Sequence, residues 1–285
     1  MTSIAVLVAC HNRVNSTVRA LESLRSGMSN AQAADLQIFL VDDGSTDDTS
    51  EVIRRRFPDV SVIVGSGNLF WNGGMVAAFQ ASRATQQKFD AYLLFNDDVV
   101  LDEAVIPSFI DAYTTINRER NSILVGATRA SSDGADVTYA GFDVGSKLRP
   151  MSFNFVKPDA GGQLRPCDTF NANFVMIPGE TMRQLNGLDA RYQHGLGDLD
   201  FGLDAKRHGV DSFVFSTIIG VCDKGPPISK RISKLPRRDR ARAIFIHPYG
   251  IKPYLVFCSK HKPKWLLPLY AVRFVLVRLG MLIKA

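Results

Sequence analysis

The sequence predicts an α/β protein with a mostly parallel sheet flanked by helices. In the first hundred residues, apolar runs of strand length alternate with amphipathic stretches of helical length, and a polar cluster follows each run. The chain has 285 residues, of which 46% are hydrophobic and 22% charged. This composition excludes collagen-like, disordered and disulfide-scaffold proteins and allows one large domain or two small ones.

Four strands and four helices are expected in this first part. The strands span 4–9, 36–41, 60–64 and 91–95, and the helices that follow them span 14–25, 48–57, 74–88 and 102–118. Strands that alternate with helices form a parallel sheet covered on both faces, and ligands bind such sheets at the carboxyl ends of the strands. Further along, 170–177 and 212–219 also have strand character. The stretch 120–170 shows only short runs and glycine-rich turns.

The cysteines and the first residues indicate a cytoplasmic protein. Cys10, Cys167, Cys222 and Cys258 stand far apart without a CxxC pair or zinc-finger spacing, so neither a disulfide framework nor a structural zinc site is expected. The apolar run 4–10 is only seven residues long and lacks a basic lead-in. It predicts a first strand rather than a signal peptide.

The charge is divided unevenly along the chain. Residues 1–223 hold 19 Lys and Arg against 27 Asp and Glu, whereas residues 224–285 hold 15 against one, Asp239. Seven of these bases fall within 230–242, and an apolar segment at 265–283 interrupted by Arg273 and Arg278 follows. Residues 230–285 therefore suit an anionic membrane surface, and two central arginines disfavour a full span. The alternative is a helix that packs on the body. No sequence pattern supports nucleic acid as the partner of this basic stretch.

Two acidic clusters follow predicted strands. Asp42 and Asp43 end the strand at 36–41; one is expected to cap the next helix and Asp43 to face a ligand, although both could be caps. Asn96, Asp97 and Asp98 end the strand at 91–95. Hard oxygen ligands of this kind suit Mg²⁺ or Mn²⁺ held together with substrate phosphate, whereas a simple turn is the alternative.

A glycine-rich turn follows the third strand. The segment 65–74 begins like a dinucleotide fingerprint but has Phe70 at the third glycine position, so a dinucleotide fold is only weakly supported. Gly73 and Gly74 would let backbone approach a ligand, and free amides at this helix start would face phosphate. Trp71 either stacks on a ring or fills the core.

Two further carboxylates, Asp198 and Asp200, occur together at 195–200. In a helix they lie about 200° apart, so one can enter the cleft while the other anchors the loop. A carboxylate within reach of an acceptor hydroxyl can act as general base. Helix capping is the alternative function of both.

Five motifs in this order resemble family 2 glycosyltransferases with a GT-A-type, Rossmann-like fold. They are Ala9-Cys-His-Asn-Arg13, Val41-Asp-Asp-Gly-Ser-Thr-Asp47, Gly67-Asn-Leu-Phe-Trp-Asn-Gly-Gly74, Asn96-Asp-Asp98 and Gly197-Asp-Leu-Asp-Phe201. The resemblance covers about residues 1–222, and bacterial rhamnosyltransferase-like enzymes of cell-surface polysaccharide are the most similar. It implies a nucleotide-sugar-binding half at 1–100, an acceptor half at 101–222 and a basic C-terminal extension at 223–285.

The resemblance also implies roles for single residues. Asp98 would coordinate Mg²⁺ or Mn²⁺, Asp97 would support it, and Asp198 would be the base of an inverting transfer. Candidate donor-binding residues are His11, Asn12, Arg13, Asp42, Asp43, Asn68, Gly73, Gly74 and Asp97, and candidate acceptor-binding residues are Trp71 and Asp200. The chain departs from the family at Gly197, where Glu is usual, and at Cys222, where His is common.

The expected donor is a UDP-, dTDP- or GDP-sugar, and the expected acceptor is a saccharide or a lipid-linked sugar. With the basic extension, this predicts a cytoplasmic enzyme bound peripherally to the inner face of the membrane. Two alternatives stay open: a sugar-phosphate nucleotidyltransferase, and a non-catalytic protein of the same fold that binds sugar or a membrane surface.

Overall fold

The computed structural model describes residues 2–31, 34–131, 136–225, 230, 235–236, 239–240, 242 and 250–284. Four bases of the predicted basic stretch, Arg231, Lys234, Arg237 and Arg238, lie outside these residues. Among the described residues, no helix is both long and apolar enough to cross a bilayer.

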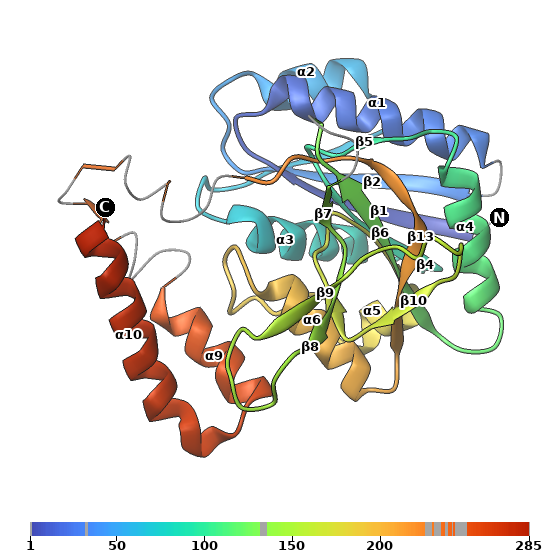
Figure 1. Cartoon of the computed structure of the whole chain (residues 1–285). Helices are drawn as coiled ribbons and strands as arrows, with labels where there is room; N and C mark the ends of the chain where they lie inside the picture. The colour runs from blue at the N-terminus through green and yellow to red at the C-terminus, as the bar shows by residue number, and fades with distance from the viewer. Residues whose placement is uncertain are drawn as a thin grey trace.

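The first hundred residues form the predicted parallel unit (Figure 1). Its elements are β1 (Thr2–Cys10), α1 (Val14–Asn30), β2 (Ala34–Asp42), α2 (Thr49–Arg56), β3 (Ser61–Val64), α3 (Phe70–Ala84) and β4 (Ala91–Asn96). β1 lies between β2 and β4, β3 pairs with the outer side of β2, and all three pairings are parallel. The carboxyl ends of these four strands therefore meet at one edge of the sheet.

Beyond β4 the sheet is mixed. The remaining elements are β5 (Val100–Leu101), α4 (Ile106–Ile116), β6 (Ser122–Arg129), β7 (Val137–Tyr139), β8 (Gly141–Val144), β9 (Phe153–Val156), β10 (Arg165–Cys167), β11 (Thr169–Phe170), β12 (Phe174–Pro178), α5 (Gly179–Gln184), α6 (Gly197–Arg207), β13 (Asp211–Val221), α9 (Ile251–His261), the 3₁₀ turn η1 (Lys264–Leu266) and α10 (Leu267–Lys284). β12 is antiparallel to both β4 and β6, while β6 and β13 are parallel. The α/β fold class is confirmed.

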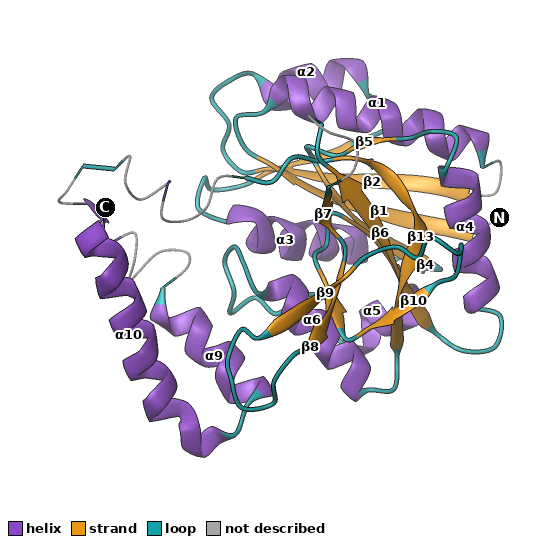
Figure 2. Cartoon of the chain, viewed as in Figure 1, coloured by secondary structure: helices purple, strands orange, loops and turns teal. Residues whose placement is uncertain are grey.

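Helices cover both faces of the large sheet (Figure 2). α1, α2 and α4 pack on one face through side chains such as Leu21, Ile53 and Phe109. α3, α5 and α6 pack on the other through Phe79, Met182 and Phe201. A smaller sheet of β11, β8 and β9 lies beside the large one.

Close contact between α3 and β1 depends on Gly74. A Cβ atom at this position would lie 2.6 Å from the Cβ of Ala9, closer than two carbon atoms approach in a folded protein. Gly74 therefore lets the first turns of α3 pack directly on β1, the strand that His11 and Arg13 follow. Its role in the structure is packing, and the donor contact predicted for it stays a prediction.

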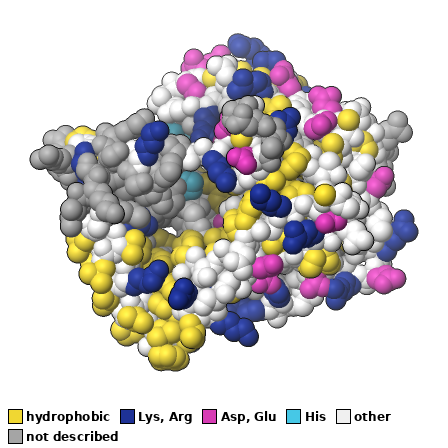
Figure 3. Space-filling model, in the orientation of Figure 1, with side chains coloured by type: hydrophobic (Ala, Val, Ile, Leu, Met, Phe, Trp, Pro, Cys, Tyr) yellow, Lys and Arg dark blue, Asp and Glu magenta, His cyan; other side chains and the backbone are white. Residues whose placement is uncertain are grey.

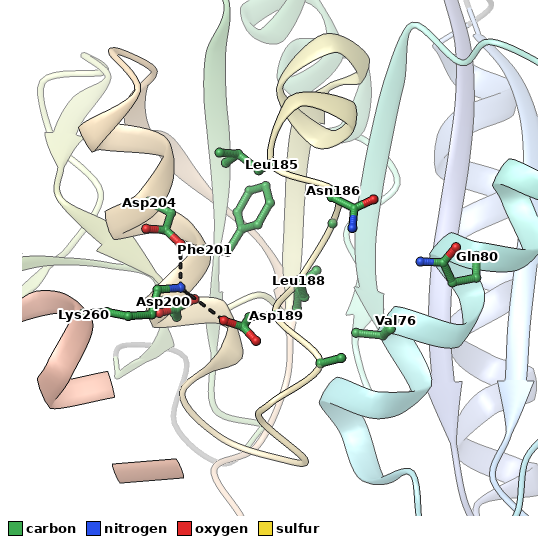
Figure 4. Close-up of a pocket in the computed structure, with 12 residues that line it drawn as sticks. Val76, Gln80, Leu185, Asn186, Leu188, Asp189, Asp200, Phe201, Asp204 and Lys260 are labelled. Carbon is green, nitrogen blue, oxygen red and sulfur yellow. Dashed lines mark hydrogen bonds and ion pairs between the residues drawn. The ribbon is translucent and has the colours of Figure 1, made fainter. Parts of the chain in front are cut away.

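The C-terminal helices are attached to α6 through one buried carboxylate (Figure 4). Asp200, only 1% exposed, accepts hydrogen bonds from the Tyr192 hydroxyl at 2.9 Å and from Lys260 Nζ at 2.6 Å. Nε2 of His261 lies 2.7 Å from Asp200 Oδ1. Because Lys260 and His261 end α9, these contacts hold α9 against the first turn of α6.

Lys260 serves two more carboxylates. Its Nζ lies 2.7 Å from Asp204 Oδ2 and 3.2 Å from Asp189 Oδ2. Burial disfavours the charged form of Asp189, but hydrogen bonds from Arg191 and Lys260 prevail and lower its pKa to about 2. Burial likewise opposes the charge of Lys260, yet the bonds to Asp200 and Asp204 raise its pKa. Lys260 thus connects α9 to three carboxylates, and Arg191 and Arg207 provide further positive charge at Asp189 and Asp204.

Replacing Gly74 with alanine is expected to destabilise the fold by about 1–3 kcal/mol, because the added methyl group overpacks α3 against β1. The free energy of unfolding in urea measures this. Adding Ala9→Gly, which removes the opposing methyl group, should return part of the loss. If Gly74→Ala is as stable as the wild type, the close approach of α3 to β1 is incorrect.

Lys260→Met should cost about 3–5 kcal/mol, because it leaves the buried carboxylate of Asp200 without its lysine. Lys252→Met, an exposed change on the same helix, should stay within about 0.5 kcal/mol. Against burial, hydrogen bonds from Arg191, followed by Lys260, lower the folded-state pKa of Asp189, so the part of the difference that comes from the contact between Lys260 and Asp189 should be present above about pH 4 and should shrink as pH falls toward 2. Equal urea stability of both variants would contradict the cluster.

Candidate active site

An arginine connects two of the sequence-predicted clusters at the carboxyl edge of the sheet. Arg13, directly after β1, donates from Nη1 to Asp98 Oδ2 at 2.7 Å and to Asp97 Oδ1 at 3.3 Å. The guanidinium is half exposed, and the side chain of Asp98 is 33% exposed. Arg13 and Asp98 therefore face the surface together, at the end of β1 and β4.

Asp97 lies below this pair in the interior. Only 6% of the residue is exposed, and Thr17 Oγ1 lies 3.5 Å from its Oδ2. Burial raises the pKa of Asp97 to about 7, against the attraction of Arg13. Asp97 contacts Arg13 from the interior, and the supporting role for Asp98 that the family resemblance implies stays a prediction.

Cys222 completes the surroundings of Asp98. It follows β13, and its Sγ lies 3.4 Å from Asp98 Oδ1 and 3.3 Å from Asn173 Nδ2. Burial, followed by the charge of Asp98, raises the pKa of this thiol, so it stays protonated at neutral pH. The position at which relatives often carry His thus holds a neutral group next to the predicted metal ligand.

These residues fit a divalent ion that is shared with a substrate. Within the part of the chain that the structure describes, no three His, Cys, Asp or Glu residues are grouped to hold a metal ion. Mg²⁺ and Mn²⁺ commonly bind one or two protein carboxylates together with substrate phosphates. The accessible carboxylate of Asp98 suits this arrangement, whereas a protonated, soft thiol at Cys222 does not add a ligand.

Polar side chains after β1 hold the loop after β2. Asn12 Oδ1 accepts from the Thr46 amide at 2.7 Å, and the Asn12 amide donates to Ser45 Oγ at 2.8 Å. His11 Nδ1 lies 2.8 Å from the carbonyl oxygen of Asp43. Asp42, 2% exposed, accepts from the Ser45 amide at 3.0 Å. His11, Asn12 and Asp42 thus shape the end of β2, and their contact with a donor stays a prediction.

Asp43 differs from expectation. Rather than pointing to a ligand, its carboxylate is 4% exposed and accepts three backbone hydrogen bonds. The amide of Gly67 donates to Oδ1 at 2.7 Å, and the amides of Leu69 and Phe70 donate to Oδ2 at 2.8 and 2.9 Å. The first amides of a helix lack partners within it, so a carboxylate arriving from β2 is favoured at this place.

The amides of this turn are therefore not available for phosphate, and that prediction is wrong for five of them. Besides the three bound to Asp43, those of Asn72 and Gly73 donate to the carbonyl of Gln193 at 3.0 and 3.3 Å. Asn68 is exposed at the same turn. Trp71 packs partly against the core and donates from Nε1 to Asn96 Oδ1 at 2.7 Å, which places its ring next to the Asp97 and Asp98 pair.

Asp198 lies in the first turn of α6, opposite the start of β12. Its Oδ2 accepts from the Ala172 amide at 3.3 Å and lies 3.4 Å from Asn171 Nδ2, and its Oδ1 accepts from the Leu199 amide at 2.8 Å. The side chain is half-buried, and burial raises its pKa. A carboxylate with a raised pKa is suited to accept a proton near neutral pH.

Asp200, two residues along, does not lie free for an acceptor. Tyr192, Lys260 and His261 occupy both of its oxygens, so the structure gives it an anchoring role. This matches the sequence expectation that one of the two carboxylates anchors the loop. Its predicted acceptor contact would require this buried cluster to open.

The unusual Gly197 is explained by a neighbour from α3. A Cβ atom at 197 would lie 1.7 Å from Asn72 Oδ1, so a larger residue cannot coexist with Asn72 as placed. The Asn72 amide group donates to the carbonyls of Tyr192 and Asp189 at 2.8 and 3.0 Å. Asn72 thus occupies the space next to Gly197 and holds the loop before α6.

Sequence reasoning missed the short segment between β11 and β12. Asn171 and Ala172 contact Asp198, while the Asn173 carbonyl accepts from the Asn96 amide at 2.9 Å and its side chain reaches Cys222. This segment connects the candidate base to the candidate metal ligand. The signal was the polar run Asn171-Ala-Asn173, which follows β11 and resembles the polar residues that follow β1, β2 and β4.

The chain was compared with models of protein families, with curated proteins and with solved structures. The family model described as Glycosyl transferase family 2 matches residues 5–169. No curated protein matches the chain.

Solved structures share the fold at low sequence identity. S. aureus TarS 1–349 is 12% identical, with a TM-score of 0.54, over 92% of this chain and 70% of that one. Its complex with UDP-GlcNAc is 11% identical, with a TM-score of 0.57, over 96% of this chain and 72% of that one. The mannosyltransferase PcManGT from Pyrobaculum calidifontis, in complex with GDP-Man and Mn²⁺, is 12% identical, with a TM-score of 0.57, over 98% and 84%. The fold is therefore the GT-A fold that the sequence predicts.

Of the functions that the sequence left open, the family match supports glycosyl transfer, since it covers more than half of the chain and includes the strand ends that carry Arg13, Asp43 and Asp98. The chain belongs to glycosyltransferase family 2.

Proposed function

We propose that this glycosyltransferase transfers a sugar from a nucleotide-sugar donor to a saccharide or lipid-linked acceptor, with inversion at the anomeric carbon. The observation that carries the proposal is the position of Asp198 and Asp98 on the two sides of the segment 171–173. One carboxylate can take a proton while the other holds the donor diphosphate.

The base side of the reaction rests on Asp198. Its carboxylate takes the proton of the acceptor hydroxyl, the acceptor oxygen forms a bond to the anomeric carbon, and the bond from that carbon to the nucleoside diphosphate breaks. Attack from the face opposite the leaving group inverts the configuration. The backbone amides of Ala172 and Leu199 fix the carboxylate, which holds the base in one orientation.

The donor side rests on the end of β1 and β4. Arg13 is half exposed and can turn from Asp98 toward a diphosphate, and Asp98 would hold Mg²⁺ or Mn²⁺. When bound, such an ion neutralises the charge that develops on the departing diphosphate. Asp97, His11, Asn12, Asp42, Asp43, Asn68, Gly73 and Gly74 make up the proposed remainder of the donor site, mostly by shaping its walls.

The structural neighbours indicate which donors to test. TarS was solved with UDP and UDP-GlcNAc, and PcManGT with GDP-Man. UDP-, dTDP- and GDP-sugars are therefore the classes proposed here. Trp71, next to Asn96, is the proposed acceptor contact, and a role in cell-surface polysaccharide synthesis at the cytoplasmic side of the membrane follows from a lipid-linked acceptor.

Asp198→Asn should lower the transfer rate about 10²–10⁴-fold, because the amide cannot accept the proton, while leaving donor binding nearly unchanged. Product formation and isothermal titration with the donor measure the two effects. In the wild type, the rate should fall as pH decreases through the raised pKa of Asp198, since only the carboxylate is active. Asp111→Asn, on an exposed part of α4, is the matched control. Full turnover of Asp198→Asn would exclude Asp198 as the base.

Asp98→Ala should abolish the metal-dependent stabilisation by a donor. A nucleotide sugar at a hundred times its Kd raises stability by about 2.7 kcal/mol, visible as a rise in melting temperature. We expect one nucleotide class to stabilise the wild type only with Mn²⁺ or Mg²⁺, and Asp111→Ala to behave as wild type. Equal shifts with and without the ion in all three proteins would show a donor site that needs no metal at Asp98.

A further inference from the structure

α10 and the turn before it have two apolar faces, of which one is covered. Tyr270 and Phe274 are buried and pack with Tyr254 and Cys258 of α9. On the opposite side, a stripe of large apolar side chains is exposed. Its members and their exposed fractions are Trp265 75%, Leu269 60%, Val272 56%, Leu276 63% and Leu279 43%.

The spacing shows that this stripe is one continuous surface. Its members follow one another at intervals of four, three, four and three residues, which keeps them on a single face of a helix. Figure 3 shows the hydrophobic surface along the outer edge of this helix. Large apolar patches are rare on the surface of a monomer and mark a site of interaction.

A second apolar surface adjoins it. A groove of about 680 Å³ opens between α9 and α10, lined chiefly by Ile251, Leu255, Val256, Leu267 and Ala271. The helix pair thus exposes apolar surface both on its outer edge and between its members. An extended apolar environment would cover both surfaces at once, whereas a single side chain of a partner protein would fill only the groove.

The charge around the stripe selects the occupant. Residues 250–284 contain seven Lys and Arg and neither Asp nor Glu, and Lys264 and Arg273 are exposed beside the stripe. If a second copy of α10 packed on the stripe, Arg273 and Arg278 of each copy would lie near the arginines of the other. Neither helix has an Asp or Glu to balance this charge. An anionic lipid surface instead supplies both an apolar phase and opposite charge.

We propose that α10 lies flat in the interface of an anionic bilayer, with the stripe from Trp265 to Leu279 inserted among the acyl chains and Arg273 at the headgroups. Trp265 ends the stripe at the position where tryptophan favours the boundary between headgroups and hydrocarbon. This deepens the proposed function, since a lipid-linked acceptor would be presented at the same surface, but it rests on α10 itself.

The test uses the full chain and vesicles of phosphatidylcholine with and without 30% phosphatidylglycerol. We expect co-sedimentation with the anionic vesicles that is at least tenfold tighter than with neutral ones, and weaker binding in high salt. Leu269→Glu with Leu276→Glu should lower the affinity at least tenfold. Val64→Glu with Val100→Glu, which makes the same charge change at exposed apolar positions on the body, should bind as wild type.

Depth is measured separately through Trp265. Brominated acyl chains should quench part of the tryptophan fluorescence, and Trp265→Phe should remove that part, because Trp71 lies in the body. Binding that is equal for neutral and anionic vesicles, or lost equally in both double variants, overturns the proposal. A wild-type dimer in ultracentrifugation that Leu269→Glu with Leu276→Glu makes monomeric, without vesicle binding, would assign the stripe to a second copy.

The vesicle experiments contain neither donor nor acceptor, and transfer is measured in a separate assay with a soluble acceptor. Absence of vesicle binding with intact transfer would therefore refute the membrane surface alone, whereas vesicle binding without transfer would refute the proposed reaction alone.

Discussion

Two adjacent carboxylates can end β4 because a cation lies between them. Asp97 is nearly buried, and burial raises its pKa to about 7 against the attraction of Arg13. Arg13 also pairs with Asp98 at the surface. Asp98, which Arg13 contacts, is the carboxylate proposed to hold a divalent ion, and an anionic diphosphate would pair with the guanidinium of Arg13 instead. One residue that follows the neighbouring strand thus brings opposite charge to the two carboxylates after β4.

The second half of the site depends on contacts between distant segments. Asn171 and Asn173 sit on either side of one residue and reach in different directions, to Asp198 and to Cys222. Asn72 comes from α3, yet it fills the space at Gly197 and holds the loop before α6. The departures from the family at Gly197 and Cys222 are therefore both matched by asparagines nearby.

Features that depend on local sequence could be predicted, whereas features that depend on contacts between distant segments could not. β1, β2 and β4 are largely buried and β3 is a short edge strand, and each contains an apolar run followed by polar residues, so both the fold class and the location of the candidate site could be read from them. β12 is also a continuous apolar run and falls within the expected strand 170–177, but its antiparallel pairing with β4 and β6 could not be predicted, because an apolar run does not specify the direction of its strand. The orientation of Asp43 could not either, since it depends on where the amides of α3 arrive in space. Cys222 and Asp98 are 124 residues apart, and nothing in their spacing predicts that contact.

The two carboxylates of α6 show how the body and the C-terminal helices act together. Asp198 and Asp200 are two residues apart and point to different sides of the helix, as a helical arrangement requires. Asp198 contacts the segment that leads to the donor site, and Asp200 holds Lys260 and His261 of α9. The first turn of α6 is consequently fixed from both sides. α10 packs on α9, so a surface that binds the exposed stripe of α10 would also orient the helix turn that carries the candidate base. The C-terminal helices are attached both at this buried ion cluster and through Phe257, which packs with Tyr192 and Leu199, and these contacts together make that orientation definite.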